Sequence, residues 1–303
     1  MADVVCLGIL VADVIVRPVE RMPERGTLGL VDEVSLRGGG CALNTATALS
    51  RLGLAAACAG KVGADPFGDF LLSLLDERGL DRALVLRDPA AATSASIVLV
   101  DRGGERTFLH VPGANGELRA EELDRERLLD ARALHVAGGL VLPALDGEPA
   151  AALLAEARRR GVLTSLDTVW DATGGWQRLE PCLAHLDVLC ASHAEATALT
   201  GEGEPDRAAS WLRARGVQAV AITLGSRGCY VEGEGFAGHV AAPAVQVVDS
   251  TGAGDAFAGG LLYGRLAGWP LERAAAFANA VGAAATTAVG AAEGLPTLEQ
   301  ALA

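Results

Sequence analysis

The regular alternation of apolar runs with helical patterns between residues 133 and 223 constrains the fold of this chain most strongly. The apolar runs are residues 133–137, 163–167, 188–191 and 219–223, and the helical patterns are residues 149–160, 175–184, 195–199 and 206–215. Strands that alternate with helices predict a parallel sheet covered by helices on both faces. Ligands bind such a sheet beyond the carboxyl ends of its strands. We therefore expect an α/β fold with its site at that edge.

The N-terminal half predicts a second, smaller sheet. Residues 3–10 and 55–62 read as further strands of the large sheet, and residues 42–52 and 66–78 as helices. The residue patterns at 28–31 and 33–36 predict two short, exposed strands. The runs 93–100 and 107–111 flank a polar turn, which is typical of a hairpin. With 303 residues, half of them hydrophobic, the chain is long enough for one large domain with this appendage.

The stretch from Val248 to Phe257 reads as a strand end, a tight turn and a helix start. Gly252 and Gly254 allow a sharp turn and a close approach of the backbone to a ligand. The N–H groups of the first helical turn have no partners within the helix, so they form an anion site. Asp255 lies at its mouth as a fixed carboxylate. This combination suits transfer of a phosphoryl group to a hydroxyl, although Gly-x-Gly before a helix is equally common as a plain turn.

A second glycine cluster, residues 38–40, precedes the helix at 42–52. Asn44 lies in the first turn of that helix, where its amide either reaches a ligand hydroxyl or bonds locally to the helix end. Asp13 interrupts an apolar extended segment. A single acidic residue there is more typical of a turn than of a ligand contact.

Composition excludes several classes of protein. A net charge of −13 argues against nucleic-acid binding, which needs basic surfaces. The six cysteines form no Cys-x-x-Cys pair and no zinc-like cluster with histidine, so we expect reduced thiols and a cytoplasmic location. No signal segment opens the chain. The alanine-rich run 274–292 has too few large aliphatic residues for a membrane span and predicts a buried helix.

Two motifs near opposite ends of the chain resemble the signatures of the ribokinase-like (PfkB) carbohydrate kinases. The N-terminal one is Gly39-Gly40-Cys41-Ala42-Leu43-Asn44 followed by residues 48–53, and the C-terminal one is residues 249–257. Further matches lie between them in the expected order, at residues 60–63, 65–68, 104–106, 112–115 and 223–225. The resemblance covers essentially the whole chain, and both signatures in order are highly specific.

The resemblance implies a ribokinase-like α/β three-layer sandwich in one domain, 1–303, with a lid of β-strands within 13–38 and 93–112. It also implies ATP as donor, Mg²⁺ and possibly K⁺, and a sugar hydroxyl as acceptor. Asp255 matches the catalytic base, and the N–H groups of Gly252, Ala253 and Gly254 match the cradle for the transferred phosphoryl group. The positions that match sugar-binding residues are Asp13, Gly39, Gly40 and Asn44.

The remaining matches concern the nucleotide and the metals. The positions that match the nucleotide site are Ser192, Thr223, Gly225, Gly228 and Asn279. Glu195 matches the acidic residue that organises Mg²⁺ through water, and the potassium site would be Asp249, Thr251 and carbonyls near Ala285, Ala288 and Gly290. From the residues alone, Glu195 reads equally as an exposed helix residue, Thr223 to Gly225 as a plain strand end, and Asn279 as a solvated helix residue.

The sequence departs from the family pattern at several positions, of which Ser192 concerns the phosphate or metal contacts and Cys41 the sugar. Ser192 stands where the family usually has Asn, Ser250 where Thr is commoner, and Cys41 where Lys or another polar residue is frequent. Residues 167–171 replace the Asp-Pro-Asn type stretch of many sugar-acid kinases, and there is no clear arginine pair for a substrate carboxylate. The interpretation therefore favours a neutral, ribose- or fructose-like sugar.

Other functions remain alternatives. A nucleoside kinase shares the fold and the base, and a non-catalytic sugar or nucleotide sensor shares the fold, although a sensor has no need of Asp255. A nicotinamide dehydrogenase and a P-loop kinase are disfavoured, because the chain has neither Gly-x-Gly-x-x-Gly after its first strand nor Gly-x-x-x-x-Gly-Lys-Ser/Thr. The expected partners are a sugar and ATP, with no nucleic acid and no membrane. The lid is also a possible homodimer surface.

Overall fold

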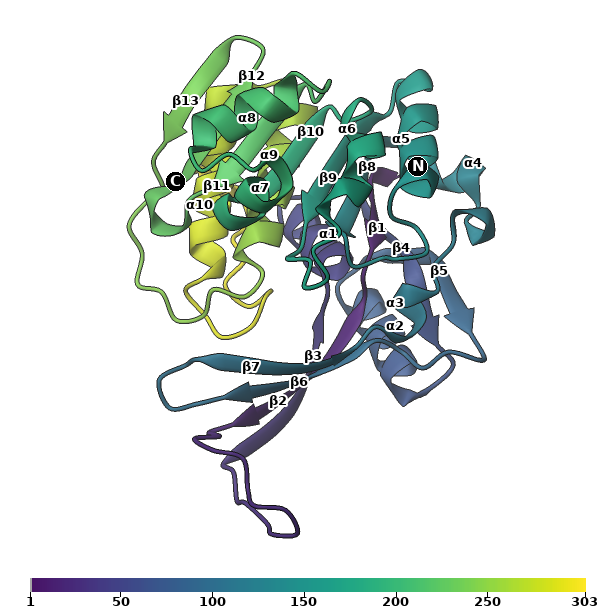
Figure 1. Cartoon of the computed structure of the whole chain (residues 1–303), viewed down its shortest axis with the longest axis vertical. Helices are drawn as coiled ribbons and strands as arrows, with labels where there is room; N and C mark the ends of the chain where they lie inside the picture. Colours follow the sequence, from purple (N-terminus) through teal and green to yellow (C-terminus); the bar gives the residue numbers. More distant parts are fainter. Residues whose placement is uncertain (1) are drawn as a thin grey trace.

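The computed structural model describes residues 2–303 and contains two sheets, a large one in the body and a small one projecting below it (Figure 1). The large sheet has nine strands in the order β13-β12-β11-β10-β9-β8-β1-β4-β5. Its strands are β1 (Ala2–Gly8), β4 (Ala56–Gly63), β5 (Asp81–Asp88), β8 (Ala131–Gly139), β9 (Leu163–Thr168), β10 (Val188–Ser192), β11 (Ala219–Thr223), β12 (Cys229–Gly233) and β13 (Phe236–Val240). All neighbours pair in parallel except β11–β12 and β12–β13. The α/β expectation is confirmed.

Helices cover both faces of the large sheet. They are α1 (Cys41–Arg51), α2 (Pro66–Glu77), α3 (Gly113–Gly116), α4 (Arg125–Leu128), α5 (Glu148–Arg159), α6 (Glu180–Leu183), α7 (His193–Thr200), α8 (Pro205–Arg213), α9 (Ala253–Leu266), α10 (Leu271–Ala285) and α11 (Leu298–Leu302), with 3-10 turns at Ala120–Glu122, Trp176–Leu179 and Gly225–Arg227. The helices α1, α2, α9 and α10 share cores with one face, and α4 to α8 with the other. Among residues 2–303, no helix has the length and apolarity needed to cross a membrane.

Small residues let α9 and α10 pack closely. A Cβ on Gly264 would lie 2.6 Å from the Cβ of Ala274, and one on Gly260 would lie 2.9 Å from the Cα of Ala278. Any larger side chain at these two positions would separate the helices. Alanine and glycine at these positions therefore allow α9 to pack closely against α10.

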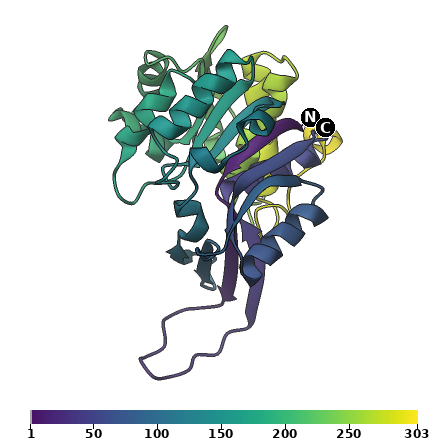
Figure 2. The same cartoon turned by 90° about the vertical axis from the view of Figure 1, so that its right-hand side faces the viewer.

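The small sheet contains β3-β2-β6-β7 in that order, with β2 (Val11–Arg17), β3 (Glu33–Gly39), β6 (Ala95–Val100) and β7 (Arg106–Val111). Its two faces differ because side chains alternate along each strand. In register, Val14 lies beside Leu36 and Ile97, and Ile97 beside Leu109, so one face is apolar. The other face carries polar residues, Asp13 beside Ser96 and Arg37. The chain between β2 and β3 forms a long excursion beyond this sheet (Figure 2).

The chain passes from the large sheet to the small one within two residues, Ile9 and Leu10. The Asn115 side chain accepts a hydrogen bond from the Leu10 N–H at 3.3 Å and donates one to the Leu10 carbonyl at 3.0 Å. Both backbone groups of Leu10 are therefore satisfied although it has no strand neighbour there. The crossing point is buried and fixed.

Several local predictions are wrong. Residues 28–31 form no strand, whereas residues 81–88, for which the sequence predicts no element, form the edge strand β5. The helix expected to span 274–292 ends at Ala285. The segment 175–184 is a 3-10 turn followed by the short α6. Asp13, expected in a turn, lies within β2.

Candidate active site

The N-terminus of α9 is bare backbone. Gly252 is its N-cap with φ 73°, a left-handed conformation that favours glycine. A Cβ there would lie 2.7 Å from the Cβ of Ala291, whereas one on Gly254 would have no atom within 4 Å. Within the described chain, no side chain caps this helix, and the Ala253 N–H donates to the Ser250 carbonyl at 3.3 Å. The turn thus presents N–H groups at an open position, as an anion site requires.

Asp255 lies in the first turn of α9 and is held by α1. The Asn44 Nδ2 group donates to its Oδ2 at 2.8 Å, and Thr45 Oγ1 donates to its backbone carbonyl at 3.3 Å. Burial raises the pKa of Asp255 to about 7, and the charge of Asp167 acts in the same direction. Hydrogen bonds from Asn44 and Cys41 oppose this rise. The result is a carboxylate suited to accept a proton near neutral pH.

Three residues predicted for the sugar lie beside each other where β2, β3 and α1 meet. A Cβ on Gly39 would overlap the Asp13 carboxylate, and one on Gly40, whose φ is 93°, would overlap the Ile9 carbonyl. Burial raises the pKa of Asp13 to about 6, against a hydrogen bond from Ser96 and the charge of Arg106. The geometry brings a buried acceptor and two side-chain-free positions to the entrance of α1, the helix that carries Asn44.

A cavity of about 420 Å³ opens beside the same helix terminus. Its lining includes the predicted residues Thr223, Gly225, Gly228, Asn279, Ala253 and Gly254. Asn279 donates to the Val240 carbonyl at 2.9 Å, which fixes the end of β13 against α10. Because Gly225 and Gly228 have positive φ values, the 3-10 turn after β11 presents backbone rather than side chains to the cavity.

Ser192 is not among the residues that line this cavity. Its hydroxyl accepts a hydrogen bond from the Glu195 N–H at 3.3 Å, while Glu195 Oε2 accepts one from the Ser192 N–H at 2.8 Å. This reciprocal pair is a capping box at the start of α7, a pattern that Ser-x-x-Glu already predicts. Thr168 Oγ1 also donates to Glu195 Oε2, at 2.9 Å. Both hydrogen bonds fall on Oε2, which leaves Oε1 for a water-bridged cation.

Asp249 lies between the turn at Gly252 and the loop after α10. Its carboxylate accepts hydrogen bonds from the N–H groups of Thr251 and Gly290, both at 2.8 Å, and forms an ion pair with Arg106. Burial raises the pKa of Asp249, but these donors lower it more, and the net pKa is below the usual value. Ala285 ends α10 and Ala288 lies in the turn before Gly290. Arg106 has no sequence-based role in the prediction, apart from its place in the motif 104–106.

Sequence reasoning assigned no role to a buried group behind Asp255. The Cys41 Sγ and the carboxylate oxygens of Asp167 and Asp255 all lie within 4.8 Å of one another. His135 lies next to Asp167, with its Nε2 3.5 Å from the Asp167 Oδ2. These residues come from α1, β8, β9 and α9, so no spacing in the sequence reveals them. The available signal was a histidine and an aspartate inside apolar strands, where charged groups are rare.

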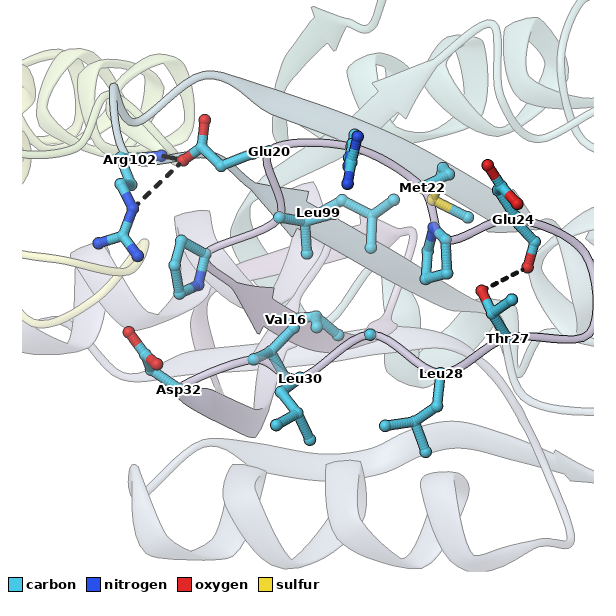
Figure 3. Close-up of a pocket in the computed structure, with 16 residues that line it drawn as sticks. Val16, Glu20, Met22, Glu24, Thr27, Leu28, Leu30, Asp32, Leu99 and Arg102 are labelled. Atoms are coloured by element: carbon cyan, nitrogen blue, oxygen red, sulfur yellow. Dashed lines mark hydrogen bonds and ion pairs between the residues drawn. The ribbon is translucent and has the colours of Figure 1, made fainter.

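A larger hollow, of about 680 Å³, lies away from Asp255 on the small sheet. Residues 16–32 with Leu99 and Arg102 line it, and Figure 3 shows Val16, Leu99 and Met22 on its walls. It contains none of the predicted site residues. Its walls continue the apolar face of the small sheet.

Comparisons with known proteins agree with this geometry. The family described as pfkB family carbohydrate kinase matches residues 1–298. The chain is 32% identical to a probable fructokinase-5 of Arabidopsis thaliana over 275 residues, 86% of this chain and 85% of that protein. It is 32% identical to a ribokinase of Mus musculus over 272 residues, 86% of this chain and 81% of that protein.

A solved structure of Arabidopsis thaliana ribokinase, described as complexed with ribose and ATP, superimposes with a TM-score of 0.86 at 25% identity, covering 99% of this chain and 97% of that one. The predicted ribokinase-like fold is therefore confirmed, with its large, mostly parallel sheet and its smaller second sheet. The family match spans nearly the whole chain, and the two curated relatives are sugar kinases by name. The chain belongs to the pfkB family of carbohydrate kinases.

Proposed function

We propose that this protein transfers the γ-phosphoryl group of ATP to a hydroxyl of a small neutral sugar, with Asp255 as the base. The observation that carries the proposal is the position of Asp255. It is hydrogen-bonded to Asn44 on the side of the predicted sugar site, and it follows directly on Ala253 and Gly254, which line the 420 Å³ cavity. A base between an acceptor site and a phosphate cradle is the arrangement that phosphoryl transfer needs.

The chemistry follows from these positions. Asp13 and Asn44 orient the sugar through hydrogen bonds to neighbouring hydroxyls, since a carboxylate and an amide offer acceptors and donors together. Asp255 takes the proton of the attacking hydroxyl as its oxygen bonds to the γ-phosphorus. The N–H groups at Gly252, Ala253 and Gly254 hold the phosphoryl oxygens and stabilise the charge that develops on them. ADP leaves through the side of the cavity lined by Thr223 and Gly225.

The residues present fit ATP and Mg²⁺. The cavity has backbone-rich walls near the turn of α9, and Asn279 closes its far side. Glu195 and Ser192 lie at the neighbouring strand end, where Ser192 pairs in register with Thr223. Mg²⁺ keeps several waters and binds phosphate oxygens, so Glu195 would hold it through water. The ion would neutralise the negative charge of the phosphates.

We also propose that K⁺ binds near Asp249. Asp249 and the loop at 285–290 lie together, because the Val248 and Asp249 N–H groups both donate to the Thr286 carbonyl. A carboxylate surrounded by loop carbonyls suits a monovalent cation that orders the turn at Gly252. Arg106 already neutralises part of this charge, so we expect potassium to raise activity modestly. Equal rates in sodium-only and potassium buffers would remove this proposal.

Two further proposals concern the state of the protein. All six cysteines are free thiols, which supports a reducing, cytoplasmic location. The apolar face of the small sheet exposes Leu36, Ile97 and Leu109 by 37%, 43% and 54%, which supports a homodimer through this face. Light scattering of the wild type and of Ile97→Asp would test the dimer, which should dissociate in the variant.

The test of the proposed function is ATP consumption against a panel of ketoses, aldoses, sugar acids and nucleosides, with Mg²⁺ and K⁺ present. We expect turnover on a neutral ketose or aldose. Turnover on nucleosides alone would keep Asp255 as base and replace the acceptor. Bound ATP without any turnover would favour a sensor.

A further inference from the structure

Behind Asp255 lies a set of buried polar groups that the proposed phosphoryl transfer does not use. Asp167 ends β9 with its carboxylate within 4.8 Å of those of Asp255 and of the Cys41 sulfur. Asp167 is 6% exposed and His135 is fully buried. Two carboxylates this close in a buried site do not ionise independently, because each charge opposes the other.

The Gly138 N–H fixes the direction of the Asp167 carboxylate, and the His135 ring lies beside it. The Gly138 N–H donates to its Oδ1 at 2.5 Å, and His135 Nε2 lies 3.5 Å from its Oδ2. The other ring nitrogen, Nδ1, lies 2.6 Å from the Ser165 hydroxyl, which holds the orientation of the ring. Within residues 2–303, the buried His135 Nε2 has no hydrogen-bond partner, so its closest polar neighbour in this arrangement is the Asp167 carboxylate.

The other groups that face this pair are thiols and one further acid. Burial is the main cause that raises the pKa of Cys41. The negative charges of Asp255, Asp167 and Glu195 raise it further. Burial raises the pKa of Cys6 on β1 and of Cys190 on β10. The charges of both aspartates add to this rise at Cys6, and the charge of Asp167 adds to it at Cys190. The helix α10 carries only Glu272 and Arg273, both in its first turn, at the opposite end from Asp255. The one cationic group beside the pair among the residues named here is His135, whose charge opposes the rise in the pKa of Asp255.

We propose that Asp167, oriented by the Gly138 N–H, is a positioning residue whose charge sets the proton affinity of Asp255 and therefore the pH range in which Asp255 acts as the base. The inference rests on the proposed role of Asp255. In the reactive state both carboxylates are ionised, and the proton of the acceptor hydroxyl moves to Asp255 as the new O–P bond forms. Repulsion from Asp167 makes Asp255 hold that proton more strongly, which favours proton transfer in the transition state. The proton leaves to water after the product.

The test compares the pH dependence of kcat/KM for the sugar in the wild type and in Asp167→Asn. The variant keeps the shape of the side chain and removes its charge. We expect the acid limb of the profile to move to lower pH by about one unit or more, with a lower plateau because Asp255 becomes a weaker base. Asp187→Asn is the matched control. Asp187 also accepts a backbone N–H, from Thr164 at 2.9 Å, but it precedes β10 and so lies at the amino ends of the strands, whereas Asp167 lies near the carboxyl end of β9.

An acid limb that stays in place in folded Asp167→Asn, or that moves equally in Asp187→Asn, would overturn the inference and leave the base assignment intact. Wild-type turnover in Asp255→Asn would instead remove the assignment of Asp255 as the base. If Asp167→Asn does not fold, NMR titration of ¹³C-carboxyl aspartate in the wild type replaces it, with Asp255→Asn for assignment. We expect the Asp255 signal to titrate in two steps because of the neighbouring carboxylate, and a single independent step at Asp255 would overturn the inference.

Discussion

Arg106, the first residue of β7, forms an ion pair with Asp249, three residues before the turn at Gly252. The pair joins the small sheet directly to the loop before the turn at Gly252, which we propose holds the transferred phosphoryl group. The two side chains are 23% and 4% exposed, whereas the other pair between the small sheet and the C-terminal loops, Arg37 with Glu293, is 48% and 41% exposed. Buried partners depend on each other far more than exposed ones, so Arg106 is the stronger connection.

We predict that Arg106→Gln lowers the free energy of unfolding by about 2 kcal/mol, because Asp249 would remain buried without its counter-charge. The same variant should depend more strongly on K⁺, since a cation would replace the guanidinium. Urea unfolding and rates in potassium and sodium buffers would measure both effects. Arg37→Gln is the control and should cost at most about 1 kcal/mol. If both variants lose the same free energy of unfolding, the ion pair of Arg106 stabilises the protein no more than the exposed ion pair of Arg37 does.

We predict that Asp255→Asn keeps ATP binding near normal and lowers turnover by about a hundredfold or more, because an amide cannot take the hydroxyl proton. Isothermal titration with ATP and steady-state rates at saturating sugar would separate the two effects. Turnover within a few-fold of the wild type would exclude Asp255 as the base.

The same substitution should raise stability at alkaline pH. The pKa of Asp255 is raised by burial to about 7, above the value of about 3.9 expected in the unfolded chain. The folded protein therefore holds a proton that the unfolded chain releases, and the wild type loses stability as pH rises from about 4 to 7. Melting curves should show Asp255→Asn melting above the wild type at pH 8, with little difference at pH 4. An equal difference at both pH values would mean that ionisation of Asp255 is not the cause.

A pair of glycine substitutions should separate folding from catalysis at the turn. Gly252→Ala meets Ala291 and keeps a positive φ, so we expect a loss of about 1–2 kcal/mol of stability together with activity. Gly254→Ala has space for its Cβ and lies in a helix, so its stability should be unchanged or higher. Its methyl group at the cradle should still lower activity. Thermal melts and rates on both variants would test this contrast.

The sequence predicts the large sheet well because its inner strands are buried on both faces. Such strands read as continuous apolar runs, as at Leu163–Thr168. The strand β5 was not expected because it lies at the edge and carries charges at both ends. The false strand at 28–31 contains Leu28 and Leu30, which are 81% and 90% exposed. Hydrophobicity alone could not show that no neighbouring strand lies beside them.

The end of α10 depends on a tertiary contact. Alanine continues after Ala285 and favours helix, but the Thr286 carbonyl accepts from Val248 and Asp249 across the molecule. Thr223, Gly225, Gly228 and Asn279, which the sequence predicts for the nucleotide site, line one cavity, because glycine turns and strand ends mark such positions locally. Their role in nucleotide binding stays a prediction. Asp167 and His135 were missed, since only the register of β8 and β9 brings them together.

The fixed crossing at Leu10 is the point at which the small sheet is attached to the body, and it lies next to the proposed sugar site. Asn115 holds this point, Asp13 follows three residues later, and the chain between β2 and β3 extends away from the body (Figure 2). A small rotation about this point would therefore move the end of that excursion much further than Asp13. Such a rotation would have to break the buried ion pair between Arg106 and Asp249, so this pair holds the small sheet in place against the body.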